Sequence, residues 1–332
     1  MSAGRRRGRS RLAAQQLSLV LVVVIMAVVF SLLTDRFADY DNLRNILLQS
    51  AATTIGAVGM TFVIVTRGID LSIGSTANFA LGLAIFLAGT RSEAALATDT
   101  SGWVYPIALA AGALLGALNA VLINRFRISP LIATLGTLTL YRGLGLHLTQ
   151  AALTAVRGPI LGFARGQLFG IGLPVFAALL VIVVGWLLLA QTVFGRRLLA
   201  LGGSPRSAAE TGIDAASLLL VVYAISGLCG ATAGLIVVGR VGVLNPDLGF
   251  GFEFTVITAV VLGGTSLFGG RGSIIGSVIG AVLLTTIDNG LNLIGANPFI
   301  YDVIRGLILM AAVSLDAIAT RLDARRLAAA GR

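Results

Sequence analysis

The chain has 332 residues, of which 57% are hydrophobic and only 11% are charged. Soluble domains contain roughly 45–50% apolar and about 25% charged residues, so this composition excludes a soluble globular protein and indicates an integral membrane protein. The net charge is +10, and all 24 basic residues are arginines.

The N-terminal residues 1–16 carry five arginines and precede an apolar run at residues 17–33. This run is too long for the core of a signal peptide, and no small-residue cleavage pattern follows it. We therefore expect an uncleaved first membrane span with a basic cytosolic flank.

A polar elbow, TRGIDLSIGS at residues 66–75, separates two predicted spans at residues 46–66 and 73–88. Gly68 and Gly74 favour a break in the helix. Asp70 is placed to accept hydrogen bonds from amides near Ser72 and so to cap the second span. We call this segment the first elbow.

The next three predicted spans cover residues 103–123, 128–148 and 168–189, each near the ~20 residues that cross a bilayer. Arg142 lies inside the fifth span. A charge at that depth is costly, so Arg142 should face protein or water rather than lipid.

A polar loop at residues 190–216 contains the sequence FGRRLLALGGSPRSAAETGI. It predicts a short helix over residues 204–211, with Ser204 as the N-cap, Pro205 at the first position and Gly212 ending it in a left-handed conformation. Arg206 and Glu210 can pair one turn apart. Spacing alone leaves two readings open, an ordinary interhelical loop and a docking site for a partner. The other residues singled out here are Arg196 and Arg197 at the entry and Gly202 and Gly203 as pliable hinges.

Four more spans are predicted at residues 217–238, 252–267, 273–288 and 299–319, which gives ten in all. A second elbow at residues 263–273, GGTSLFGGRGS, joins the eighth and ninth. Glycines 272, 276 and 280 follow at four-residue spacing and predict a flat face for close helix contact. The two elbows are either a diverged repeat or a chance likeness. The motif residues of the second elbow are Gly263, Gly264, Gly269, Gly270, Arg271 and Gly272.

The arginines are distributed unevenly between the two sides of this ten-span arrangement. With the N-terminus in the cytosol, the inner segments hold 16 arginines and the outer segments hold six, while Arg142 and Arg305 fall within spans. The positive-inside rule therefore predicts a single multi-pass membrane domain with both ends, residues 1–16 and 320–332, in the cytosol.

Several function classes are disfavoured. Without lysine the chain lacks the residue that a P-loop needs to reach ATP phosphates, and no segment resembles a nucleotide fold, a metal cluster or a nucleic-acid binding module. Asp70, Glu253, Asp288 and Asp302 fall near predicted span ends, where water should reach them, which argues against an ion-coupled secondary carrier. A passive pathway moved by an external motor fits better, and a membrane scaffold without transport is a further alternative.

Four separated motifs carry a family resemblance: GIDLSIGS at residues 68–75, ALGGSPRSAAETGI at 200–213, AVVLGGTSLFGGRGSIIGSVIGA at 259–281 and NGLNLIG at 289–295. Together they resemble the permease subunits of bacterial ABC importers for sugars, the ribose, xylose and galactose transporter class. The resemblance implies an all-α inner-membrane permease of about ten helices that is not itself an enzyme.

The same resemblance implies partners. These are an ABC ATPase with two fused nucleotide-binding halves that uses the ATP, a periplasmic or lipid-anchored solute-binding protein, and a second permease copy, either identical or related; the chain itself binds no cofactor. The helix at residues 204–211 becomes the coupling helix for the ATPase. Related permeases move polyols, nucleosides or branched-chain amino acids, so those solutes remain alternatives. Polar or aromatic residues expected to line the pathway, or else to bond helices together, are Asn78, Phe268, Asn289 and Asn292.

Overall fold

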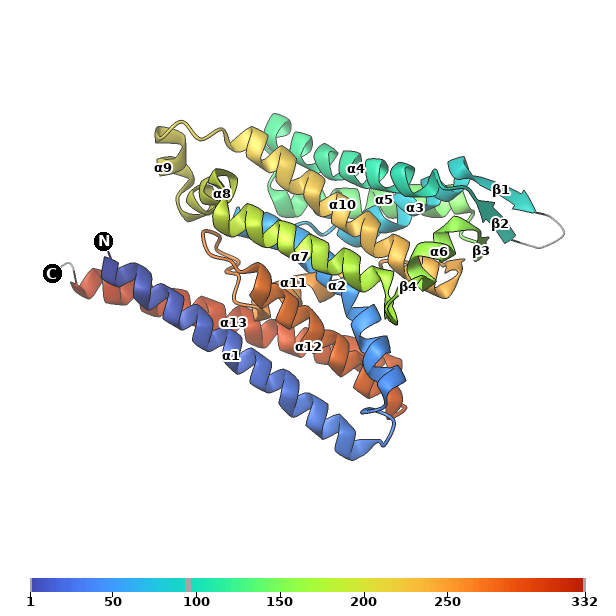
Figure 1. Ribbon diagram of the computed structural model, residues 1–332. Helices are drawn as coiled ribbons and strands as arrows, with labels where there is room; N and C mark the ends of the chain where they lie inside the picture. Colours follow the sequence, from blue (N-terminus) through green and yellow to red (C-terminus); the bar gives the residue numbers. More distant parts are fainter. Residues whose placement is uncertain (1, 93–96, 331–332) are drawn as a thin grey trace.

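A computed structural model describes residues 2–92 and 97–330. Parts of the predictions for residues 1–16 and 320–332 lie outside the described residues. The described chain forms ten helices at the ten predicted places, and three shorter helices connect them (Figure 1). The ten are α1 (Ser2–Leu33), α2 (Tyr40–Val65), α3 (Ile73–Ala88), α4 (Val104–Phe126), α5 (Pro130–Thr149), α7 (Leu173–Gln191), α10 (Ala215–Val241), α11 (Phe252–Leu262), α12 (Ile274–Leu293) and α13 (Pro298–Ala330).

Six helices of the described part, α1, α2, α4, α7, α10 and α12, are long and apolar enough to cross a membrane. The apolar helices α3 and α11 are shorter, with 16 and 11 residues. At 1.5 Å per residue they span about 24 and about 17 Å, less than the ~30 Å hydrocarbon core. Neither helix is therefore long enough by itself to cross the bilayer, although the described chain forms a helix at each of the ten predicted places.

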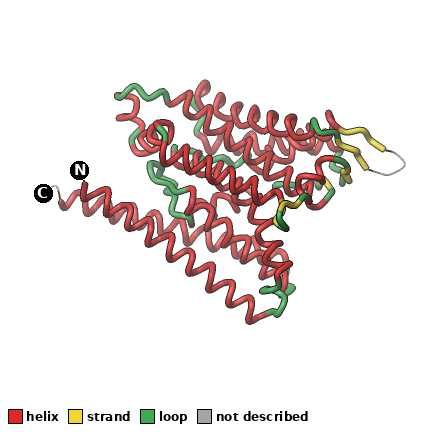
Figure 2. The backbone as a smooth tube through the Cα atoms, in the orientation of Figure 1, coloured by secondary structure: helices red, strands yellow, loops and turns green. Residues whose placement is uncertain are grey.

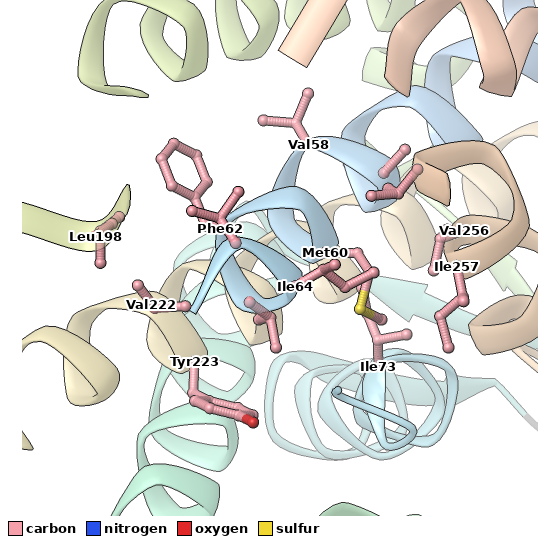
Figure 3. Close-up of a cluster of buried hydrophobic side chains, with 14 of the residues drawn as sticks. Val58, Met60, Phe62, Ile64, Ile73, Leu198, Val222, Tyr223, Val256 and Ile257 are labelled. Atoms are coloured by element: carbon pink, nitrogen blue, oxygen red, sulfur yellow. The ribbon is translucent and has the colours of Figure 1, made fainter. Parts of the chain in front are cut away.

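Helix α2 lies at the centre of the bundle and packs against α10, α12, α7 and α11. Its second half is buried on all sides because every residue from Ala51 to Val65 except Thr53 is enclosed by neighbouring helices. Figure 3 shows this core, in which Met60, Phe62 and Ile64 of α2 meet side chains from α3, α8, α10 and α11. Helix α10 also packs against α4, and α3 packs against both α4 and α5.

The short helices are α6 (Pro159–Arg165), α8 (Val193–Gly203) and α9 (Pro205–Glu210). Helices α8 and α9 lie at the end of the molecule where both chain termini are found (Figure 1). Short strands, which the sequence did not predict, lie at the opposite end (Figure 2). We call the two ends the inner and outer ends, after the orientation that the arginine distribution predicts.

The outer strands form a four-stranded sheet in the order β1-β2-β3-β6. Strands β1 (Gly89–Ser92) and β2 (Ala97–Thr100) pair antiparallel, β2 pairs parallel with β3 (Thr154–Arg157), and β3 pairs antiparallel with β6 (Val243–Leu244). A separate hairpin joins β4 (Gln167–Leu168) to β5 (Ile171–Gly172). The sheet thus joins three of the segments that connect helices at the outer end.

Two of the boundaries that differ from the prediction do so because of glycine. Helix α7 begins at Leu173 rather than near residue 168, since Gly170 in the β4–β5 hairpin has φ 78°. Helix α11 ends at Leu262 rather than near residue 267, since Gly264 has φ 90°. Glycine enters this left-handed region without a steric penalty and so ends the helix.

Candidate functional site

The short helix α9 forms as its capping signals predict. The Ser204 hydroxyl accepts from the Ser207 amide at 3.3 Å, Pro205 takes the first position, and Gly212 has φ 75°. Arg206 Nε lies 3.3 Å from Glu210 Oε1 on the exposed face. The opposite face is anchored because Ala208 is buried in the main apolar cluster. Helix α9 therefore presents a charged, solvated surface while its other side is fixed to the bundle.

Helix α8, which the sequence did not predict, precedes α9 directly. It carries Arg196 and Arg197 on its exposed face, and it buries Leu198 and Leu201. Gly202 is not the pliable hinge that the sequence suggested. It is the buried end of a helix, and a Cβ atom there would lie 1.8 Å from the Val65 carbonyl oxygen, whereas Gly203 has open space around it.

The first elbow holds the end of α8 through one arginine. Arg67 Nε donates to the Gly202 carbonyl at 2.5 Å, and its Nη2 donates to the Gly203 carbonyl at 2.8 Å. These two carbonyls belong to the last turn of α8, whose acceptors have no partner within the helix. A positive charge also suits a helix C-terminus. Arg67 therefore acts as a C-terminal cap supplied by a residue 135 positions away.

The second elbow completes this contact. The Gly270 amide donates to the Val65 carbonyl at 2.9 Å, and Gly269 packs against the Arg67 side chain. Both glycines have positive φ, 75° and 73°. The two elbows, predicted from separate motifs, thus meet each other and the end of α8. We call this contact the elbow joint.

The glycine face of α12 continues from the elbow joint into the bundle. A Cβ atom at Gly276 would lie 1.9 Å from the Gly263 carbonyl oxygen, and one at Gly280 would lie 2.1 Å from the Ala259 carbonyl oxygen. Only glycine allows this approach of α12 to α11. The predicted flat face is confirmed for Gly276 and Gly280, and its partner is α11 with the start of the second elbow. Gly272 lies before α12 and packs against Val65 of α2 instead.

The remainder of the first elbow turns back into the bundle. Asp70 accepts from the Ser72 amide at 3.0 Å, from the Ser72 hydroxyl at 2.7 Å and from the Ser226 hydroxyl of α10 at 2.6 Å. Asn119 of α4 donates to the Ser72 hydroxyl at 2.7 Å. The expected hydrogen bond from the Ser72 amide to Asp70 forms, but it does not cap α3, because Ser72 is the N-cap residue and the helix start has no side-chain cap. The network ties the start of α3 to α4 and α10.

The sequence predicted that water reaches the acidic residues Asp70, Glu253, Asp288 and Asp302. This prediction is wrong for two of them. Asp70 is 1% exposed and Glu253 is 4% exposed. The reason is that α3 and α11 begin deep in the bundle. A Cβ atom at Gly230, the middle of α10, would lie 2.8 Å from the Ile73 carbonyl oxygen, and Gly74 packs against Gly249 just before α11. Short helices that start inside a membrane bundle are typical of transport pathways.

The four candidate pathway residues do not form one site. Asn78 is buried and donates to the Pro246 carbonyl at 3.1 Å. The Asn289 amide is also buried and exchanges two 3.0 Å hydrogen bonds with Asn42. These contacts are the interhelical bonding that the sequence allowed as an alternative. Phe268 is exposed on the second elbow at the inner end, and Asn292 is exposed near the outer end of α12.

A pocket of about 350 Å³ at the outer end brings together three arginines that the sequence placed on separate outer segments. Arg44 comes from α2, Arg165 from α6 and Arg240 from α10. Arg240 Nη2 donates to the Asn45 side chain at 2.9 Å, and the buried Arg44 Nε has no hydrogen-bond partner among the described residues. We call this site the arginine pocket. Only the folded chain shows it, because its members lie far apart in sequence.

The loop leaves α9 through a capped helix start. Asp214 accepts from the amides of Ala216 and Ser217 at 3.0 and 3.3 Å, and from the Ser217 hydroxyl. The Ser217 hydroxyl is the main cause that lowers the pKa of Asp214 below its usual value. The entry and exit of the 190–216 loop are thus both fixed to helix ends.

Among the described residues, no group of three or more His, Cys, Asp or Glu side chains is arranged to hold a metal ion. Cys229 is buried between helices, where its Cβ and Sγ atoms pack against Gly59.

Comparisons with known proteins agree along most of the chain. A family model described as the branched-chain amino acid transport system / permease component matches residues 42–313. The ribose import permease protein RbsC of Bacillus subtilis (strain 168) is 38% identical over 307 residues, which cover 91% of this chain and 92% of the relative. The corresponding RbsC of Escherichia coli (strain K12) is 36% identical over 319 residues, covering 95% and 97%.

A relative named for another sugar matches to a similar degree. The galactose/methyl galactoside import permease protein MglC of Escherichia coli (strain K12) is 35% identical over 312 residues, covering 90% of this chain and 92% of the relative. No solved structure matches the chain at a significant level.

Proposed function

Because this chain belongs to the family of branched-chain amino acid transport system / permease components, we propose that it forms the membrane pathway for a neutral sugar in an ATP-driven importer. The observation that carries the proposal is the full-length similarity to import permeases named for ribose and galactose. The chain is a multi-pass membrane transport subunit and not an enzyme. The choice of a sugar is our inference from these relatives.

The motor is a separate ATPase subunit. The family is one of permease components, and the chain has no lysine from which to build a P-loop of its own. We infer an ATPase with two fused nucleotide-binding halves below the inner end, and a second permease copy that completes the pathway.

The coupling route begins at α9. Its exposed Arg206 and Glu210 offer the ATPase a charged surface on a helix that Ala208 fixes to the bundle. A movement of α9 is transmitted to the end of α8, because only Ser204 separates the two helices. Arg67 joins the end of α8 to the first elbow. The first elbow leads through Asp70 to α10 and α3. Motion of this rigid, packed chain of contacts would shift the short helix α3 as the ATPase closes.

The arginine pocket supports a solute-binding protein as the outer partner. The positive-inside rule disfavours arginine on the outer side, yet three converge there. Guanidinium groups bind carboxylates with paired hydrogen bonds, so the pocket suits acidic side chains on the surface of a docking protein. We infer that the binding protein releases its solute above this end of the bundle.

The inner end is proposed to face the cytosol. Both termini lie at the same end as α9 (Figure 1), and cysteines introduced at Gly8, Arg206 and Ala329 should then be labelled only from the cytosol. Labelling of Ala329→Cys from outside in intact cells would contradict this orientation.

The test of function is reconstitution of the permease with its ATPase and binding protein in proteoliposomes. We expect uptake of ribose or galactose that requires both ATP and the binding protein. Uptake of leucine, a polyol or a nucleoside in place of these sugars would contradict the sugar assignment. Uptake that follows a proton or sodium gradient without ATP would contradict the importer class.

A further inference from the structure

A cavity of about 240 Å³ lies between α2, α3, α10, α11, α12 and α13, apart from both the elbow joint and the arginine pocket. We call it the bundle cavity. It is slightly smaller than the roughly 300–1,000 Å³ of sites that enclose drug-sized ligands, so its room suits a solute the size of a single sugar ring. Its lining includes Thr53, Phe250, Phe252, Thr255, Asp288 and Arg305.

The cavity contains an ion pair inside the bundle. Arg305 Nη2 on α13 lies 2.6 Å from Asp288 Oδ2 on α12, and about a quarter of each side chain is exposed. Asp288 lies five residues before the end of α12, about 8 Å below it at 1.5 Å per residue. Ionisable groups at such depth are costly and typically line solute pathways or water-filled cavities.

The ion pair includes one hydrogen-bond donor that has no partner among the described residues. Arg305 Nε is buried without a hydrogen-bond partner among the described residues, although Nη1 also contacts Asp302 at 3.2 Å. A buried donor without a partner costs free energy, so the site lacks a polar group that would complete it. Nε is enclosed in this structure, so a solute hydroxyl or a water would bond to it only after the Arg305 side chain shifts.

Aromatic rings form the other wall. The Phe252 ring packs against Gly56 of α2, where its Cζ atom would lie 2.7 Å from a Cβ atom, and this packing fixes the ring. Phe250 is 73% exposed, and the Arg142 guanidinium lies 5.0 Å from its ring centroid. This cation–π contact steadies the Phe250 ring beside the cavity. Arg142 thus faces protein, as its depth in the fifth span required.

We propose that the bundle cavity is a transit site for a monosaccharide, in which Asp288 and Arg305 hydrogen-bond the sugar hydroxyls and the phenyl rings contact the C–H face of the ring. This inference rests on the proposed import of a sugar. Asp288 and Arg305 neutralise each other within the cavity, and Asp302, which also contacts Arg305, does not line it. An uncharged polyhydroxylated solute can therefore bond to the edges of the pair without separating the two charges. A zwitterionic amino acid would instead compete with the 2.6 Å contact.

The experiment uses the complete reconstituted importer and measures sugar transported per ATP hydrolysed. Uptake by the unmodified importer tests the proposed function by itself, and the variants then test the cavity. Asp288→Asn should lower the transport ratio at least tenfold. Asp302→Asn is the matched control, because it removes a neighbouring contact to the same arginine without lining the cavity, and it should change the ratio less than twofold.

A second variant guards against misfolding of the first. Thr53→Phe places bulk in the cavity without removing an ion-pair partner, and it should also lower sugar transported per ATP at least tenfold while the melting temperature is maintained. The proposal is overturned if both variants transport sugar at the unmodified ratio, or if Asp302→Asn lowers the ratio as much as Asp288→Asn does.

Discussion

Helix α9 exposes Arg206 and Glu210 to solvent, whereas α8, which ends two residues before α9 begins, buries Gly202 against α2 and the second elbow. The first surface can accept a changed side chain because no residue in the described part of the chain covers it. The second cannot accept even a methyl group. The comparison indicates that the proposed docking and force transmission are separable, since they would depend on neighbouring residues under different packing constraints.

The largest loss of stability is expected at Gly276, on the glycine face of α12. Leucine there would force α12 away from the second elbow, because its Cβ atom would lie only 1.9 Å from the Gly263 carbonyl oxygen. We expect a loss of about 3 kcal/mol or more, the upper end for overpacked cores. Thermal unfolding in detergent measures it. Gly306→Leu is the control, since no atom lies within 4 Å of its Cβ position, and equal melting temperatures for the two variants would contradict the packing.

The sharpest test of the comparison pairs two adjacent glycines. Gly202→Ala should destabilise the protein by about 1–3 kcal/mol, because its methyl group would lie 1.8 Å from the Val65 carbonyl. Gly203→Ala should be neutral or stabilise it by up to about 1 kcal/mol, since alanine restricts the unfolded chain and meets no neighbour. The melting temperatures of both variants, measured under the same conditions, test this difference in stability. Similar values would show that the elbow joint is loosely packed.

A smaller change in stability is expected at Arg67, where the side chain is partly solvated. Arg67→Ala removes two hydrogen bonds to the end of α8 and should cost about 1 kcal/mol. Arg67→Gly should cost less, because Arg67 has φ 68° and glycine adopts that conformation without strain. Both variants should lower sugar transported per ATP, since either one disconnects α8 from the first elbow. An unchanged transport ratio in both would remove Arg67 from the coupling route.

The smallest change in stability and a complete loss of transport are expected together at Glu210. Glu210→Arg removes a pairing with Arg206 that is worth only ~0.2–0.5 kcal/mol to the helix. It also reverses the charge on the face that meets the ATPase. The protein should insert and assemble normally but fail to retain the ATPase or to import solute. Copurification with the ATPase and unmodified uptake would show that α9 is not the docking helix.

The success of sequence interpretation at α9 and its failure at α8 have a physical cause. Ser204, Pro205 and Gly212 act on groups within a few residues, so their effect is written in the local sequence. Helix α8 carries arginines beside leucines and three glycines, and its end is stabilised by Arg67 from a distant segment. A cap supplied from 135 residues away leaves no local signal.

The acidic residues show the same limit in another form. The sequence placed Asp70 and Glu253 beside glycine-rich breaks, which usually mark the water-exposed ends of spans. Depth in the bundle depends instead on where α10 and α2 hold the short helices, and the fold encloses both carboxyl groups. Burial of this kind is decided by packing between segments.

By itself, the sequence determined the membrane class, the places of the ten helices, the capped helix α9 and the glycine face of α12, because hydropathy, capping and side-chain size act locally. The tertiary structure alone decided that the two elbows meet at the end of α8, that three outer arginines share one pocket, and that Asp288 and Arg305 face one cavity. Each of these sites joins residues from separate helices. Their approach depends on the packing of the whole bundle, which no local pattern encodes.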